Sequence, residues 1–232
     1  MTDARPLAVF DLDGTLIETA GDLMATLNHI LAAEGLRTVA LAEAREMIGD
    51  GAKAMLQKGF KANDTALDGE RLERLFADFL THYSANIANE SFAFPGVVDL
   101  LDRLDAAGIL AAVCTNKPEA MSKQLLAELG LAERFAIIAG PETFGARKPD
   151  PRHLTETIRA VGGAPESAVM IGDSRNDIDA ARGAGVPVIV VDFGYTTVPV
   201  DQLGPDRIVS HFDEIWAAIG EVAPGVMAAA RA

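Results

Sequence analysis

The sequence predicts an α/β protein with a parallel sheet, helices on both faces of that sheet, and an all-helical insert. From residue 94 onward, short apolar runs alternate with helical patterns, which is typical of parallel strands joined by crossover helices. Residues 20–90 carry apolar side chains at helical spacing and no convincing strand. One apolar run, Leu7–Phe10, precedes this helical stretch. The helices therefore interrupt the α/β pattern directly after its first strand.

The insert is predicted from two apolar stripes. In the first, leucines and isoleucines recur at helical spacing up to Gly35, a natural C-terminal stop. The second stripe consists of Leu72, Leu75, Phe76, Phe79, Leu80, Tyr83 and Ile87. Between them lies Gly49-Asp50-Gly51, followed by Lys53. The backbone of this break could approach a ligand closely, but an ordinary helix–helix turn with Asp50 as N-cap is slightly favoured.

The α/β pattern resumes after Phe94-Pro95-Gly96. Further strands are expected at 109–114, 135–139, 168–171, 186–191 and 207–210. Helical patterns stand between these runs, and a last helix containing Trp216 completes the core. Residues 228–232 are expected to form a frayed tail.

Composition excludes several classes of protein. The chain has 232 residues, of which 49% are hydrophobic, and no apolar run approaches the ~20 residues of a membrane span. A net charge of −14 argues against nucleic acid and acidic membranes as partners, so an anionic substrate would need local positive groups. The single Cys114 allows no internal disulfide and no cysteine metal cluster. We expect a soluble, cytoplasmic monomer or homodimer.

Polar and charged side chains follow four of the predicted strands. They are Asp11 and Asp13, Thr115 and Asn116, Lys148, and Asp173. In a doubly wound sheet the carboxyl ends of the strands lie at one edge, so these groups are expected to converge. If Asp11 and Asp13 stand on extended backbone, their side chains point the same way. Carboxylates with an amide and a hydroxyl suit Mg²⁺, whereas zinc is disfavoured because the four histidines are scattered.

Each of these residues also has a purely structural interpretation. A single strand-end aspartate is usually just solvated, and Asp173 and Asp177 could cap the helix that follows them. Thr115 or Asn116 could cap the next helix, and Lys148 could be a solvated loop residue. The joint occurrence of all of them at strand ends is much less probable by chance.

The motifs carry a resemblance to the haloacid dehalogenase-like hydrolase superfamily, over nearly the whole length of the chain. They are Asp11-Leu12-Asp13-Gly14-Thr15-Leu16, Thr115-Asn116-Lys117-Pro118, Lys148-Pro149-Asp150-Pro151 and Gly172-Asp173-Ser174-Arg175-Asn176-Asp177. Softer features, including Gly49-Asp50-Gly51 and Phe193-Gly194-Tyr195, resemble members that act on 2-phosphoglycolate. The resemblance implies a Rossmann-like catalytic core at 1–17 and 93–232, with a helical cap at 18–92.

The resemblance also implies roles for the strand-end residues. Asp11 would attack phosphorus and form an aspartyl phosphate, while Asp13 would act as general acid and then base. Lys148 and Thr115 would hold the phosphoryl oxygens. Mg²⁺ would be bound by Asp11, Asp173 and the backbone carbonyl of Asp13, with Asp177 as an additional or outer partner. Candidate substrate-binding residues are Asn116 and, in the cap, Gly49, Asp50, Gly51 and Lys53.

The expected function is Mg²⁺-dependent hydrolysis of a small phosphorylated metabolite, with 2-phosphoglycolate as first choice. Asp13 favours phosphoryl transfer over dehalogenation, because a departing halide needs no proton. Within the same chemistry, a phosphatase of broader specificity, a pyrophosphatase or a phosphosugar mutase remain alternatives. A non-catalytic phosphometabolite sensor, or phosphonate cleavage through an imine of Lys53 or Lys58, would be different functions.

Overall fold

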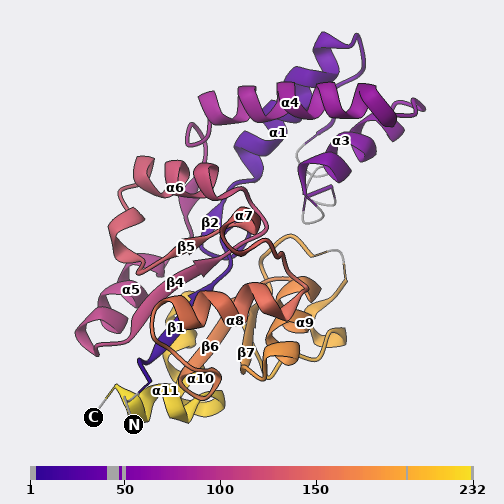
Figure 1. Cartoon of the computed structure of the whole chain (residues 1–232). Helices are drawn as coiled ribbons and strands as arrows, with labels where there is room; N and C mark the ends of the chain where they lie inside the picture. The colour runs from indigo at the N-terminus through magenta and orange to yellow at the C-terminus, as the bar shows by residue number, and fades with distance from the viewer. Residues whose placement is uncertain (1–3, 41–46, 49–50, 197, 231–232) are drawn as a thin grey trace. The chain divides into compact units, whose positions relative to one another are not determined.

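The computed structural model describes residues 4–40, 47–48, 51–196 and 198–230, and Figure 1 shows its helices and strands. The chain forms two compact units, one made of Met1–Ile17 with Ala93–Ala232 and the other of Glu18–Phe92. Strands β2 (Ile17–Glu18) and β3 (Phe92–Ala93) pair in a two-stranded sheet. The chain therefore passes between the units through two paired segments.

The larger unit is built on a six-stranded parallel sheet with the strand order β5-β4-β1-β6-β7-β8. Its strands are β1 (Leu7–Phe10), β4 (Leu110–Cys114), β5 (Ile138–Ala139), β6 (Ala168–Gly172), β7 (Val188–Val191) and β8 (Arg207–Val209). In the central register Phe10 lies opposite Val113 and Ile171, so β4, β1 and β6 end at the same level. This sheet confirms the predicted Rossmann-like α/β fold class.

Helices join the strands of the sheet. They are α5 (Val97–Ala106), α6 (Glu119–Glu128), α7 (Pro141–Phe144), α8 (Pro151–Ala160), α9 (Arg175–Ala184), α10 (Ile215–Val222) and α11 (Pro224–Ala229). Short 3₁₀ turns lie at Ala132–Arg134, Pro165–Ser167, Val200–Gln202 and Phe212–Glu214. Val9 and Met170 pack in one core cluster with Leu154 of α8 and Ile178 of α9. The central strands are fully buried, as expected for a parallel sheet.

The smaller unit contains α1 (Ala20–Ala33), α3 (Ala52–Lys61) and α4 (Gly69–Ala85), which pack against one another. None of its described residues between 20 and 90 lies in a strand, as the sequence predicts. Gly35 has a φ of 72° just after α1, which fits its predicted role as a helix stop. The Asp22 carboxylate accepts hydrogen bonds from the backbone amides of Glu90 and Ser91. This contact ties the start of the unit to its end.

Two expectations differ from the structure. The strand predicted at 135–139 is limited to β5, because the chain first completes a 3₁₀ turn at Ala132–Arg134. The frayed tail predicted at 228–232 is wrong for its described part, since α11 continues to Ala229. Pro224 occupies the first turn of α11, and the fully buried Val226 anchors the helix on the larger unit.

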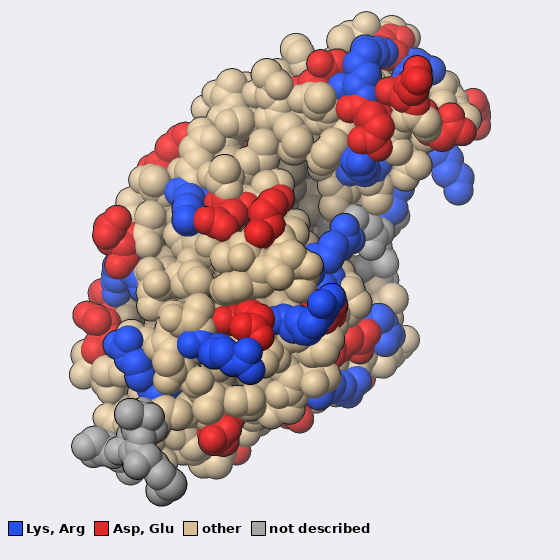
Figure 2. Space-filling model, in the orientation of Figure 1, with Lys and Arg blue, Asp and Glu red and all other residues tan. Residues whose placement is uncertain are grey.

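The surface contributes less to stability than the core. Figure 2 shows basic and acidic side chains interspersed over one face of the molecule. Exposed ion pairs such as Arg152–Asp150 and Arg159–Glu156, both at 2.6 Å, contribute little to stability because water and salt screen them. No helix in the described ranges has the length and apolar character needed to cross a membrane.

The buried centre of the sheet leads to a stability prediction. Ile171 of β6 is 0% exposed, so Ile171→Ala should lower the free energy of unfolding by about 2–5 kcal/mol through lost burial and a residual cavity. Urea denaturation followed by the fluorescence of Trp216, the one tryptophan, measures the change. The matched control Val98→Ala, at a side chain 44% exposed, should change stability by less than about 0.5 kcal/mol. Equal effects of the two substitutions would contradict this account of the core.

Candidate active site

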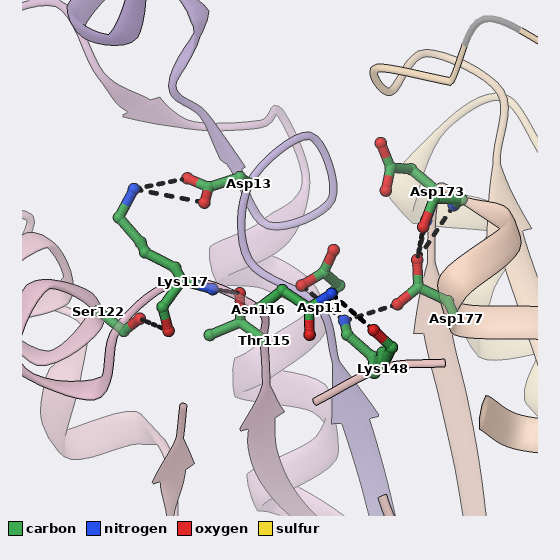
Figure 3. A network of polar contacts seen from close by, with 10 residues as sticks. Asp11, Asp13, Thr115, Asn116, Lys117, Ser122, Lys148, Asp173 and Asp177 are labelled. Atoms are coloured by element: carbon green, nitrogen blue, oxygen red, sulfur yellow. Dashed lines mark hydrogen bonds and ion pairs between the residues drawn. The ribbon is translucent and has the colours of Figure 1, made fainter. Parts of the chain in front are cut away.

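The carboxyl ends of three neighbouring strands carry the central groups of the site. Asp11 follows β1, Thr115 follows β4 and Asp173 follows β6. Because β1 lies between β4 and β6 in matching register, these residues come together at one edge of the sheet. Figure 3 shows them with Lys148, which belongs to the loop between α7 and α8. The convergence expected from the sequence is therefore present.

A turn begins at Leu12, between the two aspartates of the first motif. The Leu12 carbonyl accepts hydrogen bonds from the amides of Thr15, Leu16 and Ile17, and strand β1 ends at Phe10. The sequence placed the two side chains on one side only if the extended backbone continued through Asp13, and the turn at Leu12 interrupts it before that residue. In Figure 3 Asp11 lies beside Lys148, while Asp13 lies beside Lys117.

Lys148 forms the buried centre of the site. Its Nζ lies 2.8 Å from Oδ1 of Asp11 and 2.6 Å from Oδ1 of Asp177, and its side chain is 2% exposed. Burial alone would lower the pKa of Lys148, but the two carboxylates outweigh burial and raise it above its ordinary value. The Asn116 Nδ2 donates to the backbone carbonyl of Lys148 at 2.9 Å. Lys148 is therefore a fixed positive charge and not a solvated loop residue.

Asp11, Asp173 and Asp177 form a compact acidic cluster, with one oxygen from each lying within 4.8 Å of the others. Burial raises the pKa of Asp11 to about 6, although the charge of Lys148 opposes the shift. Burial, followed by the charges of Asp177 and Asp11, raises the pKa of Asp173 well above its usual value. Burial, and to a lesser extent the neighbouring carboxylates, therefore disfavour the charged forms of Asp11 and Asp173. Its carboxylates could hold a metal ion.

Backbone packing fixes Asp173 in this cluster. Its Oδ2 accepts a hydrogen bond from the Tyr195 amide at 2.7 Å. A Cβ at Gly194 would lie 2.2 Å from the Asp173 Cβ, and one at Gly14 would lie 2.6 Å from its Oδ2. Both positions therefore require glycine. Sequence reasoning used Phe193-Gly194-Tyr195 only as a point of likeness and missed this supporting role.

Asp177 is oriented by its neighbours as well as by Lys148. Its Oδ2 accepts from the Ser174 amide at 3.0 Å and from the Ser174 hydroxyl at 2.6 Å, and its side chain is fully buried. These bonds cap helix α9, so the structural interpretation of Asp177 is correct. The same carboxylate also belongs to the acidic cluster, and the two roles coexist.

Lys117 is the functional candidate that sequence reasoning missed. Its Nζ lies 3.0 Å from Oδ1 and 3.3 Å from Oδ2 of Asp13, and the two side chains are 5% and 23% exposed. The residue stands inside the motif Thr115-Asn116-Lys117-Pro118. Its position two residues after Thr115, in the loop that follows β4, was the available signal. The first motif therefore contacts two separate ammonium groups.

The other predicted site residues of the larger unit belong to the loop after β4. The Thr115 amide donates to the Ala139 carbonyl at 3.0 Å, and its buried hydroxyl oxygen accepts from the Lys117 amide at 3.1 Å. Asn116 Oδ1 is buried and has no hydrogen-bond partner among the described residues. This loop thus links Lys117 to the loop of Lys148.

The predicted residues of the insert are described only in part. Gly49 and Asp50 lie outside the described residues. Gly51 is the N-cap of α3 with a φ of 90°. Lys53 contacts Glu73 of α4 at 2.7 Å and lies 4.9 Å from the centre of the Phe76 ring. Its ammonium is therefore bound to the neighbouring helix of its own unit.

Comparison with known proteins identifies the family. A model of haloacid dehalogenase-like hydrolases matches residues 8–191. A protein from Mesorhizobium japonicum named phosphoglycolate phosphatase is 49% identical over 94% of this chain and 96% of its own length. One of the same name from Agrobacterium fabrum is 46% identical over 97% of both chains.

The fold agrees with this assignment. The crystal structure of a predicted phosphoglycolate phosphatase from Haemophilus somnus superimposes with a TM-score of 0.85 at 30% identity, covering 94% of this chain and 99% of that chain. Its likeness extends over both units of the present chain. The family model, the relatives and the fold give one result. The chain belongs to the family of haloacid dehalogenase-like hydrolases.

Proposed function

We propose that this protein hydrolyses 2-phosphoglycolate to glycolate and phosphate through an aspartyl phosphate at Asp11. The observation that carries the proposal is the position of Asp11, at the end of β1, 2.8 Å from the Lys148 ammonium and within an acidic cluster. The names of the relatives from Mesorhizobium and Agrobacterium support this substrate.

The acidic cluster fits Mg²⁺, because all of its donors are carboxylate oxygens. Asp11, Asp173 and the backbone carbonyl of Asp13 would hold the ion, with Asp177 as an additional or outer partner. When bound, Mg²⁺ supplies positive charge that stabilises the phosphoryl oxygens. The raised pKa values of Asp11 and Asp173 support a bound cation, since added positive charge relieves the repulsion among the carboxylates.

Asp11 and Asp13 divide the covalent chemistry. A carboxylate oxygen of Asp11 attacks phosphorus, a new oxygen–phosphorus bond forms, and the bond to the glycolate oxygen breaks. Asp13 donates a proton to that departing oxygen. It then takes a proton from the water that attacks the aspartyl phosphate, which releases phosphate and restores Asp11. Separate contacts with Lys148 and Lys117 give the two carboxylates different surroundings.

Positive and polar groups around Asp11 would bind the phosphoryl group. Lys148 balances the charge of the oxygens during transfer. Its charge also opposes the effect of burial on Asp11, and with a pKa of about 6 Asp11 is mainly ionised at pH 7. Thr115 and Asn116, at the end of β4, contribute a hydroxyl and an amide. This set offers hydrogen bonds and charge without any histidine.

We also propose that residues 18–92 act as a cap that selects a small substrate and excludes water. Gly49, Asp50, Gly51 and Lys53 remain its candidate contact residues. The unit of residues 1–17 and 93–232 then serves as the catalytic core. The soluble, cytoplasmic location and the monomeric or homodimeric state stay part of this proposal, with a small phosphorylated metabolite as the partner.

A panel of phosphorylated metabolites tests the substrate. We expect the highest kcat/KM for 2-phosphoglycolate, with hydrolysis and not isomerisation of any sugar phosphate that reacts. Phosphate release and product analysis under identical Mg²⁺ concentrations provide the measurement. A higher kcat/KM for pyrophosphate, or conversion of a sugar phosphate to its isomer, would replace the proposed substrate. Absence of phosphate release from every compound would favour a sensor.

Substitutions of the two aspartates test their separate roles. Asp11→Asn should lower kcat for 2-phosphoglycolate by about 10³-fold or more, because an amide cannot form the intermediate. Asp13→Asn should lower it by about 10²–10⁴-fold. With p-nitrophenyl phosphate the first-turnover release of nitrophenolate should fall much less, since nitrophenolate departs without a proton, whereas later turnovers still need Asp13 as the base. The exposed Asp201→Asn provides the control. Steady-state turnover by Asp11→Asn near that of the parent protein would rule out Asp11 as nucleophile.

The acidic cluster predicts a pH-dependent stability without metal. The pKa of Asp11 rises from 3.8 to about 6 on folding, so the folded chain binds this proton more tightly than the unfolded chain does. Stability relative to Asp11→Asn should therefore decrease as the pH rises from about 4 to 7, by about 3 kcal/mol. Urea denaturation in EDTA gives the difference in unfolding free energy between the parent protein and Asp11→Asn at each pH. Added Mg²⁺ should reduce the change of this difference with pH. A difference in unfolding free energy that does not change with pH would contradict the raised pKa of Asp11.

A further inference from the structure

We propose that Lys117 binds the carboxylate of the substrate and thereby determines the preference for phosphate esters that carry a carboxylate one carbon from the ester oxygen. The inference rests on the proposed function, because Asp13 must contact the departing oxygen. It assigns a specificity role to Lys117, a side chain of the larger unit that has no direct role in the proposed mechanism. Figure 3 shows Lys117 extending from the loop after β4 toward Asp13.

The contact of Lys117 with Asp13 places its ammonium near the departing oxygen of the substrate. A general acid lies about 3 Å from the atom that it protonates, so Asp13 fixes where the ester oxygen of the substrate must be. The Lys117 Nζ lies 3.0 Å from the Asp13 Oδ1. In 2-phosphoglycolate a single methylene separates the ester oxygen from the carboxylate, whose oxygens therefore lie about 2.7–3.6 Å from the ester oxygen. An ammonium that contacts Asp13 can consequently reach the substrate carboxylate.

Charge gives a second reason for this contact. Binding places the substrate carboxylate close to Asp13, and two carboxylates at short distance repel unless a cation lies between them. The ammonium of Lys148 already contacts Asp11 and Asp177 at 2.8 and 2.6 Å. Lys117 has three N–H donors, which can serve two carboxylates. Because its side chain is only 5% exposed, the attraction is screened less than at the surface.

The loop holds Lys117 in place before substrate arrives. Its amide donates to the Thr115 hydroxyl oxygen at 3.1 Å, and its carbonyl accepts from the Ser122 hydroxyl at 3.4 Å. Ser122 is fully buried in α6. The stem of Lys117 therefore starts from a fixed backbone, so that little order has to be gained on binding. A purely structural role would consist of holding Asp13 alone, and the two roles differ in their effect on substrates without a carboxylate.

The test compares 2-phosphoglycolate with ethyl phosphate, which keeps the ester oxygen and its carbon neighbours but lacks the carboxylate. Lys117→Met removes the charge and retains the length of the side chain. We expect kcat/KM for 2-phosphoglycolate to fall by about 10- to 100-fold, mainly through KM, as for the loss of one charged hydrogen bond. The kcat/KM of ethyl phosphate, whose departing oxygen needs the same proton from Asp13, should change by less than about threefold. If Lys117 only held Asp13, both esters would lose the same factor.

Controls separate specificity from folding and from the proposed function itself. Lys123→Met removes an exposed charge of the same α6 region, which pairs with Glu119, and should leave both constants unchanged. Lys117→Gln provides a second uncharged variant if Lys117→Met does not fold. Equal losses for both compounds, or an unchanged preference for the carboxylate, would overturn the assignment of Lys117. Failure of the unsubstituted protein to hydrolyse 2-phosphoglycolate would instead overturn the proposed function.

Discussion

The ion contacts of Lys148 with Asp11 and Asp177 are the interaction on which the site depends. An ammonium that is 2% exposed needs both carboxylates, and loss of one partner from such a buried pair costs about 3–5 kcal/mol. The three residues come from the turn after β1, the loop before α8 and the first turn of α9. The pairing thus connects separate loops of the sheet edge. The same contacts set the charge of the proposed nucleophile.

A second constraint is the excess of negative charge beside this lysine. Asp173 packs closely against Gly14 and Gly194, where a Cβ would clash with it, and burial raises its pKa well above the usual value. Close packing of buried carboxylates lowers the stability of the fold but keeps oxygen ligands together, as is common in binding and catalytic sites. In a chain with a net charge of −14, the ammonium groups of Lys148 and Lys117 also provide the local attraction that an anionic substrate requires.

The sequence predicted the placement of the site better than its contacts. Apolar strands followed by Asp11, Thr115 and Asp173 indicated one sheet edge, because parallel strands share the position of their carboxyl ends. Side-chain periodicity did not indicate that the turn begins as early as Leu12, before Asp13, because three backbone amides that bind one carbonyl define its start. The contact of Lys117 with Asp13 joins positions 104 residues apart and depends on tertiary packing. Spacing within the motif placed Lys117 near the edge of the sheet but did not identify Asp13 as its partner.

Direct detection of phosphate on Asp11 is the measurement that tests the central claim. The protein is mixed with Mg²⁺ and saturating 2-phosphoglycolate, quenched in acid during turnover, and reduced with borohydride to convert an acyl phosphate to an alcohol. Mass spectrometry of the peptide that contains Asp11 then locates the modification. The account predicts homoserine at position 11 and unmodified Asp13 in the same peptide. Conversion at Asp13 or at another carboxylate, or no conversion while phosphate is being released, would contradict it.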